Sequence, residues 1–577
     1  MSIQHYKKLL LALPFISTAY AIELPPGQQN KQELDRLERQ NNQALIEDAK
    51  RTEQRLQQQR TISQGEQPAK EEDSSSWKFK IDKIVILDDD LFEDAPQRVA
   101  IIERYQGKEL GKADIFNLVR ELTNFYIARG YVTTLVGIEP GNLKEGTLTL
   151  RVLWGKIDTL KANGKEPGFR QRTRLFTAYP FAKGNVLNMQ DIDQAVENLM
   201  RVSGRDNIQL IPSVVNASSD LNLITQPVFP LSLATGLNNS GSKSSGWQQY
   251  YGSATLKDIA GLNDIFNAYY SWNNLNNSED SQDSLSLSYS IPLGYWGVDL
   301  SYYKSSYDKM IGGYYGGYDS DGHSERSSIR VSRMLTRNAS GKTSMWAKFE
   351  KRQNYNGIEG DQIDVSSKTY SSLSSGITWV GALLGGWFYG DVGASFGTPW
   401  SNATWKNDKD LDGFDVNYIR YNGIASWSRP LFQFGRLGIN YELNTGFQYT
   451  NNTLVSDYKM TLGDEYSVRG FKDDSLMVDS GAWIANTLNF PFDINIAGIY
   501  QLTPYLGYDL GFAKDNCPEG VNACDSQFMM GAGVGVKASG RFFSSSVAAG
   551  WPVKKPDSMD KNTVDNTVVY YKLEVNF

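Results

Sequence analysis

Val468-Arg469-Gly470-Phe471 lies inside a long polar segment, residues 455–480, between two β-like runs. A second stretch, Pro504–Phe512, reads as a strand because apolar side chains alternate with Gly507, Asp509 and Gly511. One face of this strand is apolar. The other carries a lone carboxylate between two glycines, with open space around it. A loop arginine and such a strand aspartate form a natural docking pair.

The two motifs together resemble the signature of the TpsB transporters, the outer-membrane pores of two-partner secretion, which share a superfamily with the barrel-assembly factors. The resemblance implies that Arg469 folds into a barrel lumen on its loop and pairs there with Asp509. In a wet lumen this ion pair alone would contribute only about 0–1 kcal/mol. We therefore expect the pair to set the position of the loop, while Phe471 and hydrogen bonds supply most of the stability.

The composition excludes several protein classes. Hydrophobic residues make up 40% of the 577, yet no stretch after the N-terminal leader has the roughly 20 apolar residues of a membrane helix. Aromatic residues make up 12%, including 32 tyrosines and 13 tryptophans, which suits a β-barrel with aromatic girdles. The formal net charge of −7 argues against nucleic acid as a partner.

The N-terminal region predicts a leader and a polar helix. Residues 1–21 read as a secretory signal peptide, with lysines before an apolar run and a cleavage site at Ala19-Tyr20-Ala21. In residues 22–60, the part from Lys31 onward contains no Pro or Gly and reads as a helix. It is polar nearly all round, so it is either solvated or stabilised inside a polar channel. The resemblance implies a pore plug. Residues 61–76 read as a linker by their composition, which is rich in Gln, Glu, Lys and Ser.

Residues 77–155 and 156–228 each read as a small α+β domain. Helical spacing covers Asp114–Arg129 in the first and Asp191–Arg201 in the second, and a strand pair follows each. The phrase Tyr126-Ile-Ala-Arg-Gly-Tyr131, with the strand after it, resembles a POTRA domain, and the second unit resembles the family's second POTRA. This implies periplasmic domains that capture an unfolded chain on an exposed strand edge. Small domains with no binding role are the alternative.

Residues 229–577 consist of short runs in which apolar residues alternate with serine, glycine or charged residues, and the last run ends at Phe577. That ending resembles the β-signal of outer-membrane proteins. We count about sixteen runs, an even number as bacterial barrels require, with connections that alternate between tight and long. The expected fold is a membrane β-barrel of about sixteen antiparallel strands, preceded by the plug helix and two periplasmic α+β POTRA domains.

Two further motifs concern cysteines and catalysis. Cys517 and Cys524 stand in a polar stretch, and in an exported protein we expect a local disulfide between them. Gly393–Gly397 matches the pattern G-x-S-x-G, but a nucleophile elbow needs a following helix and a histidine partner. The only histidine after the leader is His323, which we predict in a loop. We therefore expect no enzyme activity.

An acidic loop is the one candidate metal site. Asp408, Asp410 and Asp412 match the first half of an EF-hand calcium loop, but the twelfth position is Ile419 instead of glutamate. The alternative is a solvated acidic loop. No phosphate-binding loop is present, so we expect no nucleotide or other cofactor and transport without ATP hydrolysis by this chain.

The sequence thus predicts a translocation pore in the outer membrane of a Gram-negative bacterium. It would secrete a large unfolded partner, an adhesin, haemolysin or contact-dependent inhibition toxin, and the overall resemblance leans towards the last (CdiB) branch. Expected partners are a TpsA-type exoprotein bound through the POTRA domains, outer-membrane lipid, and the barrel-assembly machinery during insertion. We expect a monomer and no nucleic acid.

Three alternatives remain at this stage. A barrel-assembly insertase shares the loop motif but would carry more POTRA domains and no plug. A passive porin needs neither the POTRA domains nor the arginine loop. An outer-membrane hydrolase is disfavoured by the single histidine of the mature chain.

Overall fold

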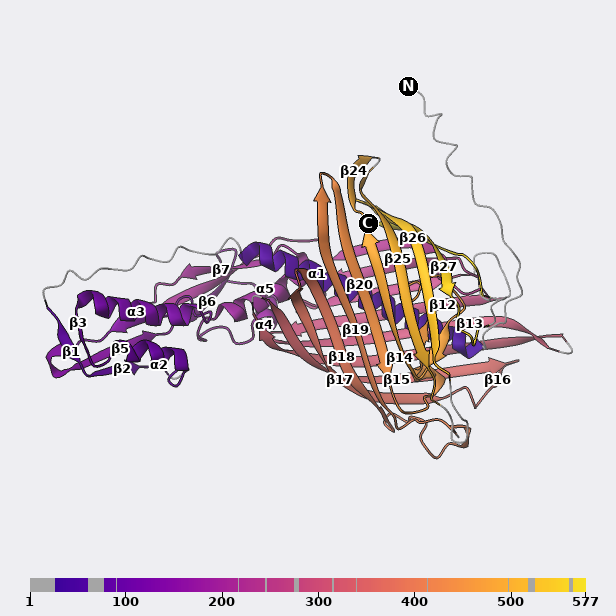
Figure 1. Cartoon of the computed structure of the whole chain (residues 1–577), viewed down its shortest axis with the longest axis horizontal. Helices are drawn as coiled ribbons and strands as arrows, with labels where there is room; N and C mark the ends of the chain where they lie inside the picture. Colours follow the sequence, from indigo (N-terminus) through magenta and orange to yellow (C-terminus); the bar gives the residue numbers. More distant parts are fainter. Residues whose placement is uncertain are drawn as a thin grey trace, which may run out of the picture.

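The computed structural model describes residues 26–577, except for residues 61–76, 90, 216, 244–245, 274–279, 314–315, 339, 412, 497, 517–524 and 560–563. It contains a closed β-barrel, two small α+β domains at one barrel end, and a helix through the barrel interior (Figure 1). We call the end that carries the domains the near end and the opposite end the far end. The predicted signal peptide and linker, Asp412, Cys517 and Cys524 lie outside the described residues.

Helix α1, Pro26–Arg60, runs inside the barrel and leaves it at the near end (Figure 1). It begins before the Lys31 expected from the sequence, because proline is tolerated in the first turn, where its missing N–H has no intrahelical partner. Its segment from Gln29 to Leu37 is mostly buried although most of its side chains are polar. The barrel interior must therefore supply polar partners. No described helix is long and apolar enough to cross a membrane.

The first α+β domain has a three-stranded sheet in the order β2-β5-β4, with β2 and β5 parallel. Helix α3 covers this sheet with Leu118, Leu122 and Tyr126, all fully buried. The elements are β1 Phe79–Ile81, β2 Lys83–Leu87, α2 Pro96–Glu103, β3 Lys108–Leu110, α3 Lys112–Ile127, β4 Leu135–Ile138, the 3-10 turn Leu143–Glu145 and β5 Thr147–Leu153.

The second α+β domain repeats this arrangement with the sheet order β6-β8-β7. Helix α5 begins where the Asn188 side chain accepts the N–H of Gln190 at 2.8 Å, and it ends at Gly204, whose φ of +66° favours glycine. The elements are β6 Lys156–Ala162, α4 Phe169–Ala178, α5 Met189–Ser203, β7 Asn207–Pro212 and β8 Ser218–Ile224.

Helix α5 docks directly on the near-end turns of the barrel. Asn198 donates to the carbonyl of Gly294 at 2.8 Å, and Glu197 forms ion pairs with Lys342, at 2.5 Å, and Arg337. Burial by itself would raise the pKa of Glu197, but the two cations lower this pKa to about 2. The second domain is thereby joined to the barrel through buried polar contacts.

The barrel has sixteen antiparallel strands and closes where β28 pairs with β9. They are β9 Leu231–Asn238, β10 Gln249–Lys257, β11 Ile265–Trp272, β12 Ser281–Leu293, β13 Trp296–Gly313, β14 Gly316–Arg337, β15 Gly341–Ile358, β17 Thr369–Leu383, β18 Gly386–Thr398, β19 Ile419–Phe434, β20 Leu437–Tyr449, β23 Ser480–Asn489, β25 Ile499–Lys514, β26 Gln527–Gly540, β27 Phe543–Lys554 and β28 Val568–Asn576. Two short strands, β16 Asp361–Gln362 and β24 Phe492–Ile496, prolong this sheet.

Strand β25 shows how alternation divides the barrel wall. Leu506, Tyr508 and Phe512 are exposed on the outer surface, while Asp509 and Gly511 are buried on the inner one. The predicted apolar face of this strand is confirmed. It suits contact with lipid, because apolar side chains on the outer surface are unfavourable in water but not in a bilayer. The loop predicted around His323 is wrong: this residue lies on β14, with its ring stacked on Tyr355.

Candidate functional site

The segment between β20 and β23, residues 450–479, folds back into the barrel, and we call it the VRGF loop. It contains a 3-10 turn, Ser456–Tyr458, and a small hairpin of β21, Met460–Leu462, and β22, Leu476–Val478. Its tip carries Val468, Arg469, Gly470 and Phe471, all of which are buried. The loop therefore occupies the lumen together with α1.

Arg469 meets Asp509 on the lumen face of β25 through three hydrogen bonds. Its Nη2 lies 2.5 Å from Oδ1 of Asp509, its Nε 2.7 Å from Oδ2, and its own backbone N–H donates to Oδ2 at 2.9 Å. The same Nη2 also donates to the carbonyl of Asn486 and the hydroxyl of Thr487. This forked geometry fixes both the side chain and the backbone of the loop tip.

The contribution of about 0–1 kcal/mol expected from the sequence applies to an ion pair in a wet lumen. The Arg469–Asp509 pair is instead shielded from water. Asp509 has no exposed surface and Arg469 is 9% exposed. Removing one partner of a buried, hydrogen-bonded pair costs about 3–5 kcal/mol, because the other charge is left buried without a counter-ion. The pair thus contributes to holding the loop as well as to placing it.

Glycines on two neighbouring strands, β25 and β26, make room for the loop tip. A Cβ at Gly507 would overlap the guanidinium of Arg469, one at Gly531 would overlap the Arg469 carbonyl, and one at Gly511 would press on Val468. Gly470 of the loop, with φ +95°, lies against the backbone of β27. The sequence drew attention to the two glycines of β25 but missed the role of those on β26. Their only sequence signal is the small-residue alternation that β26 shares with other strands.

A small apolar cluster anchors the loop beside the ion pair. Val468 and Phe471 are fully buried against Met529 of β26, and Leu462 of the hairpin joins them. Burying side chains of this size contributes about 1.5–3 kcal/mol each. The packing that the sequence assigned to Phe471 is therefore present, with Val468 as a second apolar anchor.

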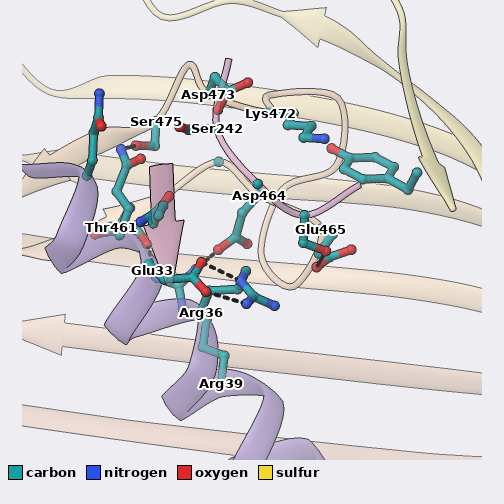
Figure 2. A pocket seen from close by; sticks show the side chains of 17 residues that line it. Glu33, Arg36, Arg39, Ser242, Thr461, Asp464, Glu465, Lys472, Asp473 and Ser475 are labelled. Atoms are coloured by element: carbon teal, nitrogen blue, oxygen red, sulfur yellow. Dashed lines mark hydrogen bonds and ion pairs between the residues drawn. The ribbon is translucent and has the colours of Figure 1, made fainter. Parts of the chain in front are cut away.

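Helix α1 contacts the opposite side of the same loop. Arg39 forms an ion pair with Asp464, Gln32 donates to the Ser475 hydroxyl at 2.7 Å, and Arg39 also donates to the Thr461 carbonyl at 2.7 Å. A cavity of about 80 Å³ with many polar and charged side chains remains between helix and loop (Figure 2). Such a space is large and polar enough to hold water.

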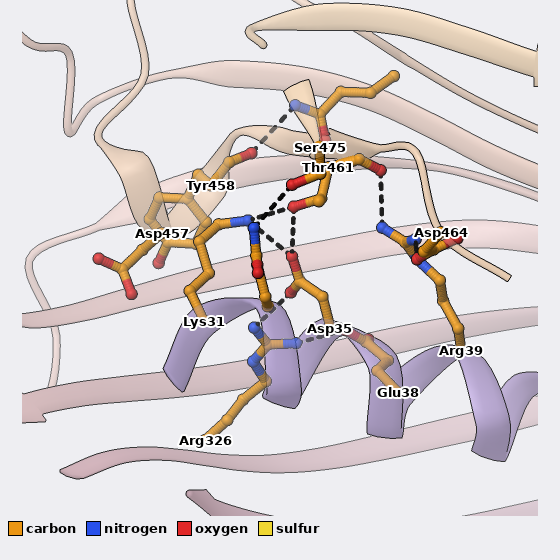
Figure 3. A network of polar contacts seen from close by, with 12 residues as sticks. Lys31, Asp35, Glu38, Arg39, Arg326, Asp457, Tyr458, Thr461, Asp464 and Ser475 are labelled. Atoms are coloured by element: carbon orange, nitrogen blue, oxygen red, sulfur yellow. Dashed lines mark hydrogen bonds and ion pairs between the residues drawn. The ribbon is translucent and has the colours of Figure 1, made fainter. Parts of the chain in front are cut away.

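The other face of α1 contacts the barrel wall. Asp35 and Glu38 both pair with Arg326 of β14 (Figure 3). Asn41 donates to the Tyr303 hydroxyl at 2.9 Å. A second cavity, of about 210 Å³, separates this part of the helix from β15 and β19. The helix is thus held by polar contacts at both sides, with voids between them.

The acidic loop already contains a cation from the protein itself. The Nζ of Lys368 lies 2.8 Å from Asp408 and 2.7 Å from Asp410. Among the described residues, no cluster of three or more His, Cys, Asp or Glu side chains is arranged to hold a metal. The predicted calcium ligand Asp412 and the predicted disulfide Cys517–Cys524 lie outside those residues.

Comparison with protein families matches three parts of this architecture. Residues 217–538 match the family described as haemolysin secretion/activation protein ShlB/FhaC/HecB. This chain belongs to that family. Residues 79–155 match the ShlB-type POTRA domain, and residues 156–212 match a further POTRA domain. The two α+β domains are therefore POTRA domains, and the near end of the barrel is its periplasmic end.

Individual relatives are similar over nearly the whole chain. The outer membrane transporter CdiB of Dickeya dadantii (strain 3937) is 27% identical over 98% of this chain and 97% of its own length. The hemolysin transporter protein ShlB of Serratia marcescens is 25% identical over 88% of this chain and 89% of its own length. The solved structure of CdiB from Escherichia coli shares the fold, with a TM-score of 0.81 at 23% identity over 97% of this chain and 100% of its own.

These findings give the chain its function. It is an outer-membrane transporter of two-partner secretion, which moves a partner exoprotein out of the periplasm. The relatives are transporters and not enzymes. The insertase alternative gains no support.

Proposed function

We propose that α1 is a removable plug and that the partner passes, unfolded, through the space that the helix vacates. The observation that carries this proposal is the position of α1 inside the closed barrel, next to the VRGF loop (Figure 1). The two cavities described beside the helix, of about 80 and 210 Å³, are small. An extended polypeptide does not fit through such spaces, so the helix must move before transport.

The contacts of α1 suit a reversible plug. Apart from a small cluster of Leu34 and Leu37 with Tyr303, and the Lys50 ammonium over the ring of Trp387, the contacts of its described side chains are hydrogen bonds and ion pairs. Water can replace such contacts at a net cost of about 0.5–1.5 kcal/mol each. The VRGF loop differs because its tip combines a buried, forked ion pair with a fully buried apolar cluster, which water cannot replace at low cost. We therefore expect the helix to leave while the loop tip stays on the wall.

Deleting residues 22–60 tests the plug, since channel conductance in a planar bilayer should rise strongly. A milder change, Arg39→Ala, removes the ion pair to Asp464 and should raise the open fraction of the full-length channel several-fold. Arg51→Ala is the matched control, because Arg51 pairs with Glu47 on the exposed part of the same helix. Unchanged conductance after the deletion would refute the plug.

We further propose that the first POTRA domain captures the partner on the free edge of β4. Among the described strands it pairs only with β5, and its Leu135 and Ile138 are exposed. Ladder alternation leaves the N–H of Ile138 pointing away from β5, because Glu139 bonds to Thr149 across the ladder. The N–H of Val136, the other outward donor of β4, is bonded to the Thr123 hydroxyl, so the edge offers the Ile138 N–H and exposed apolar side chains to an extended chain.

A proline at this edge tests the capture. Ile138→Pro removes one outward N–H and leaves the β4–β5 ladder intact, so the domain should fold while partner secretion falls. Ile138→Thr keeps the N–H and should secrete normally. Equal secretion by both variants, at equal levels of inserted barrel, would rule out β4 as the capturing edge.

We also propose that the cargo is a large exoprotein of the contact-dependent inhibition type. Relatives named CdiB match this chain over most of its length. Folding of the cargo outside the cell would then pull the chain outward without ATP. Co-expression with candidate exoproteins, followed by detection at the cell surface, distinguishes this cargo from a haemolysin.

A further inference from the structure

Arg326 of β14 is a lumen cation whose described ion-pair partners come from the plug. Its side chain is 3% exposed, with Nη1 2.5 Å from Oε2 of Glu38 and Nη2 3.0 Å from Oδ1 of Asp35 (Figure 3). Its Nε has no hydrogen-bond partner among the described residues. If the plug leaves, as proposed above, Arg326 loses both of these carboxylates.

Glu350, which lies diagonally across the β14–β15 ladder from Arg326, is already shared by two other cations. Glu350 of β15 receives Nε of Arg352 at 2.6 Å and Nζ of Lys348 at 2.9 Å. Next along β14, Arg330 has its own partner, Asp391 of β18, at 2.8 Å. Neither carboxylate is therefore free to neutralise Arg326.

The wall around this residue carries more positive than negative charge. Its lumen-facing cations, spread over β14, β15 and β19, are Arg326, Arg330, Lys348, Arg352 and Arg420, against the three carboxylates Glu350, Asp391 and Asp299, the last of which lies opposite Arg330 on β13. In the plugged state Asp35 and Glu38 offset part of this excess. An emptied lumen would expose an arginine with all its donors free, in a region where another carboxylate would be attracted.

We propose that Arg326 is a binding station for carboxylate side chains of the polypeptide in transit. Aspartates and glutamates of the partner bind it in turn, in the place that Asp35 and Glu38 occupy in the plugged state. The carboxylates of the plug thus occupy the position that carboxylates of the secreted partner take during transport. Because acidic segments then compete with α1 for the same guanidinium, an entering chain also hinders the return of the plug. This inference rests on the proposed plug function.

Block of the channel by a defined peptide tests the proposal. The channel lacking residues 22–60 is recorded in a planar bilayer, since the barrel closes through β28 and β9 without α1. Oligoglutamate of about ten residues, added from the POTRA side, should block the current at a concentration at least tenfold lower than neutral oligoglutamine. Arg326→Gln should remove most of this difference, and Arg326→Lys should restore part of it.

The same strand offers a matched control. Arg333 also lies on β14 but is exposed on the outer surface, with its guanidinium 5.1 Å from the ring centre of Trp296. Arg333→Gln should leave the block unchanged. In the full-length channel, Arg326→Gln should raise the open fraction, because it removes the ion pairs of Arg326 with both Asp35 and Glu38 of the plug.

Different results would overturn the plug function and the binding station at Arg326. If the shortened channel conducts no more than the full chain, the plug function fails and the binding station with it. If it conducts well but oligoglutamate blocks Arg326→Gln as strongly as the unsubstituted channel, the station alone is overturned. The station is equally overturned if oligolysine blocks as strongly as oligoglutamate.

Discussion

Replacing Asp509 by asparagine is the change that most directly tests how the VRGF loop is held. The carboxylate is fully buried and accepts three hydrogen bonds from Arg469, all within 2.9 Å. Asparagine keeps the size but removes the charge, and it turns an amide N–H₂ towards the guanidinium. The buried cation then lacks a counter-ion, which costs about 3–5 kcal/mol. The ratio of docked to released loop should fall by about two to four powers of ten.

Trypsin cleavage measures this release in the inserted protein. Lys472, next to the loop tip, is 7% exposed and should be cut only when the loop opens. Asp509→Asn should therefore be cut at Lys472 much faster than the unsubstituted protein, and it should secrete less partner. Glu47→Gln breaks a pair that is 68% exposed and should change cleavage by less than tenfold.

A double-variant cycle separates the pair from other effects of the substitution. Arg469→Ala combined with Asp509→Ala removes both buried charges, so the double variant should lose less stability than the two single variants added together. The reasoning is refuted if the single costs simply add. It is also refuted if Asp509→Asn is cleaved no faster than the Glu47→Gln control.

Three further predictions concern separate features. Gly507→Ala should release the loop much as Asp509→Asn does, because its Cβ would overlap the Arg469 guanidinium, whereas Gly252→Ala, with open space around it, should secrete normally. The pKa of Glu197 is lowered from 4.5 to about 2, so its ionised form stabilises the contact between the second POTRA domain and the barrel by about 3 kcal/mol. This stabilisation is complete above pH 4.5 and is lost as the pH falls towards 2. Thermal unfolding of Glu197→Gln should lack this pH dependence. Thiol labelling of the unreduced, denatured protein should find no free cysteine if Cys517 and Cys524 are paired, and labelling of both would exclude the disulfide.

Local patterns in the sequence determined the elements of this protein. Alternation with period two marks a strand whatever surrounds it, and the strand around Asp509 could be assigned, with its outer and inner faces, from nine residues alone. The polar helix at the N-terminus was equally visible. Its composition excluded an apolar core, and so pointed either to water or to a polar interior.

The tertiary structure alone decided how strongly these elements interact. Whether Arg469 and Asp509 lie in water depends on how the loop tip with Val468 and Phe471 packs onto the glycines of β25 and β26, and loop and strands are distant from each other in the sequence. Likewise, Arg326 reads in the sequence as one more charged strand residue. Only closure of the barrel around α1 brings it to Asp35 and Glu38, because the cost and the partner of a charge are set by its surroundings in space and not by its neighbours along the chain.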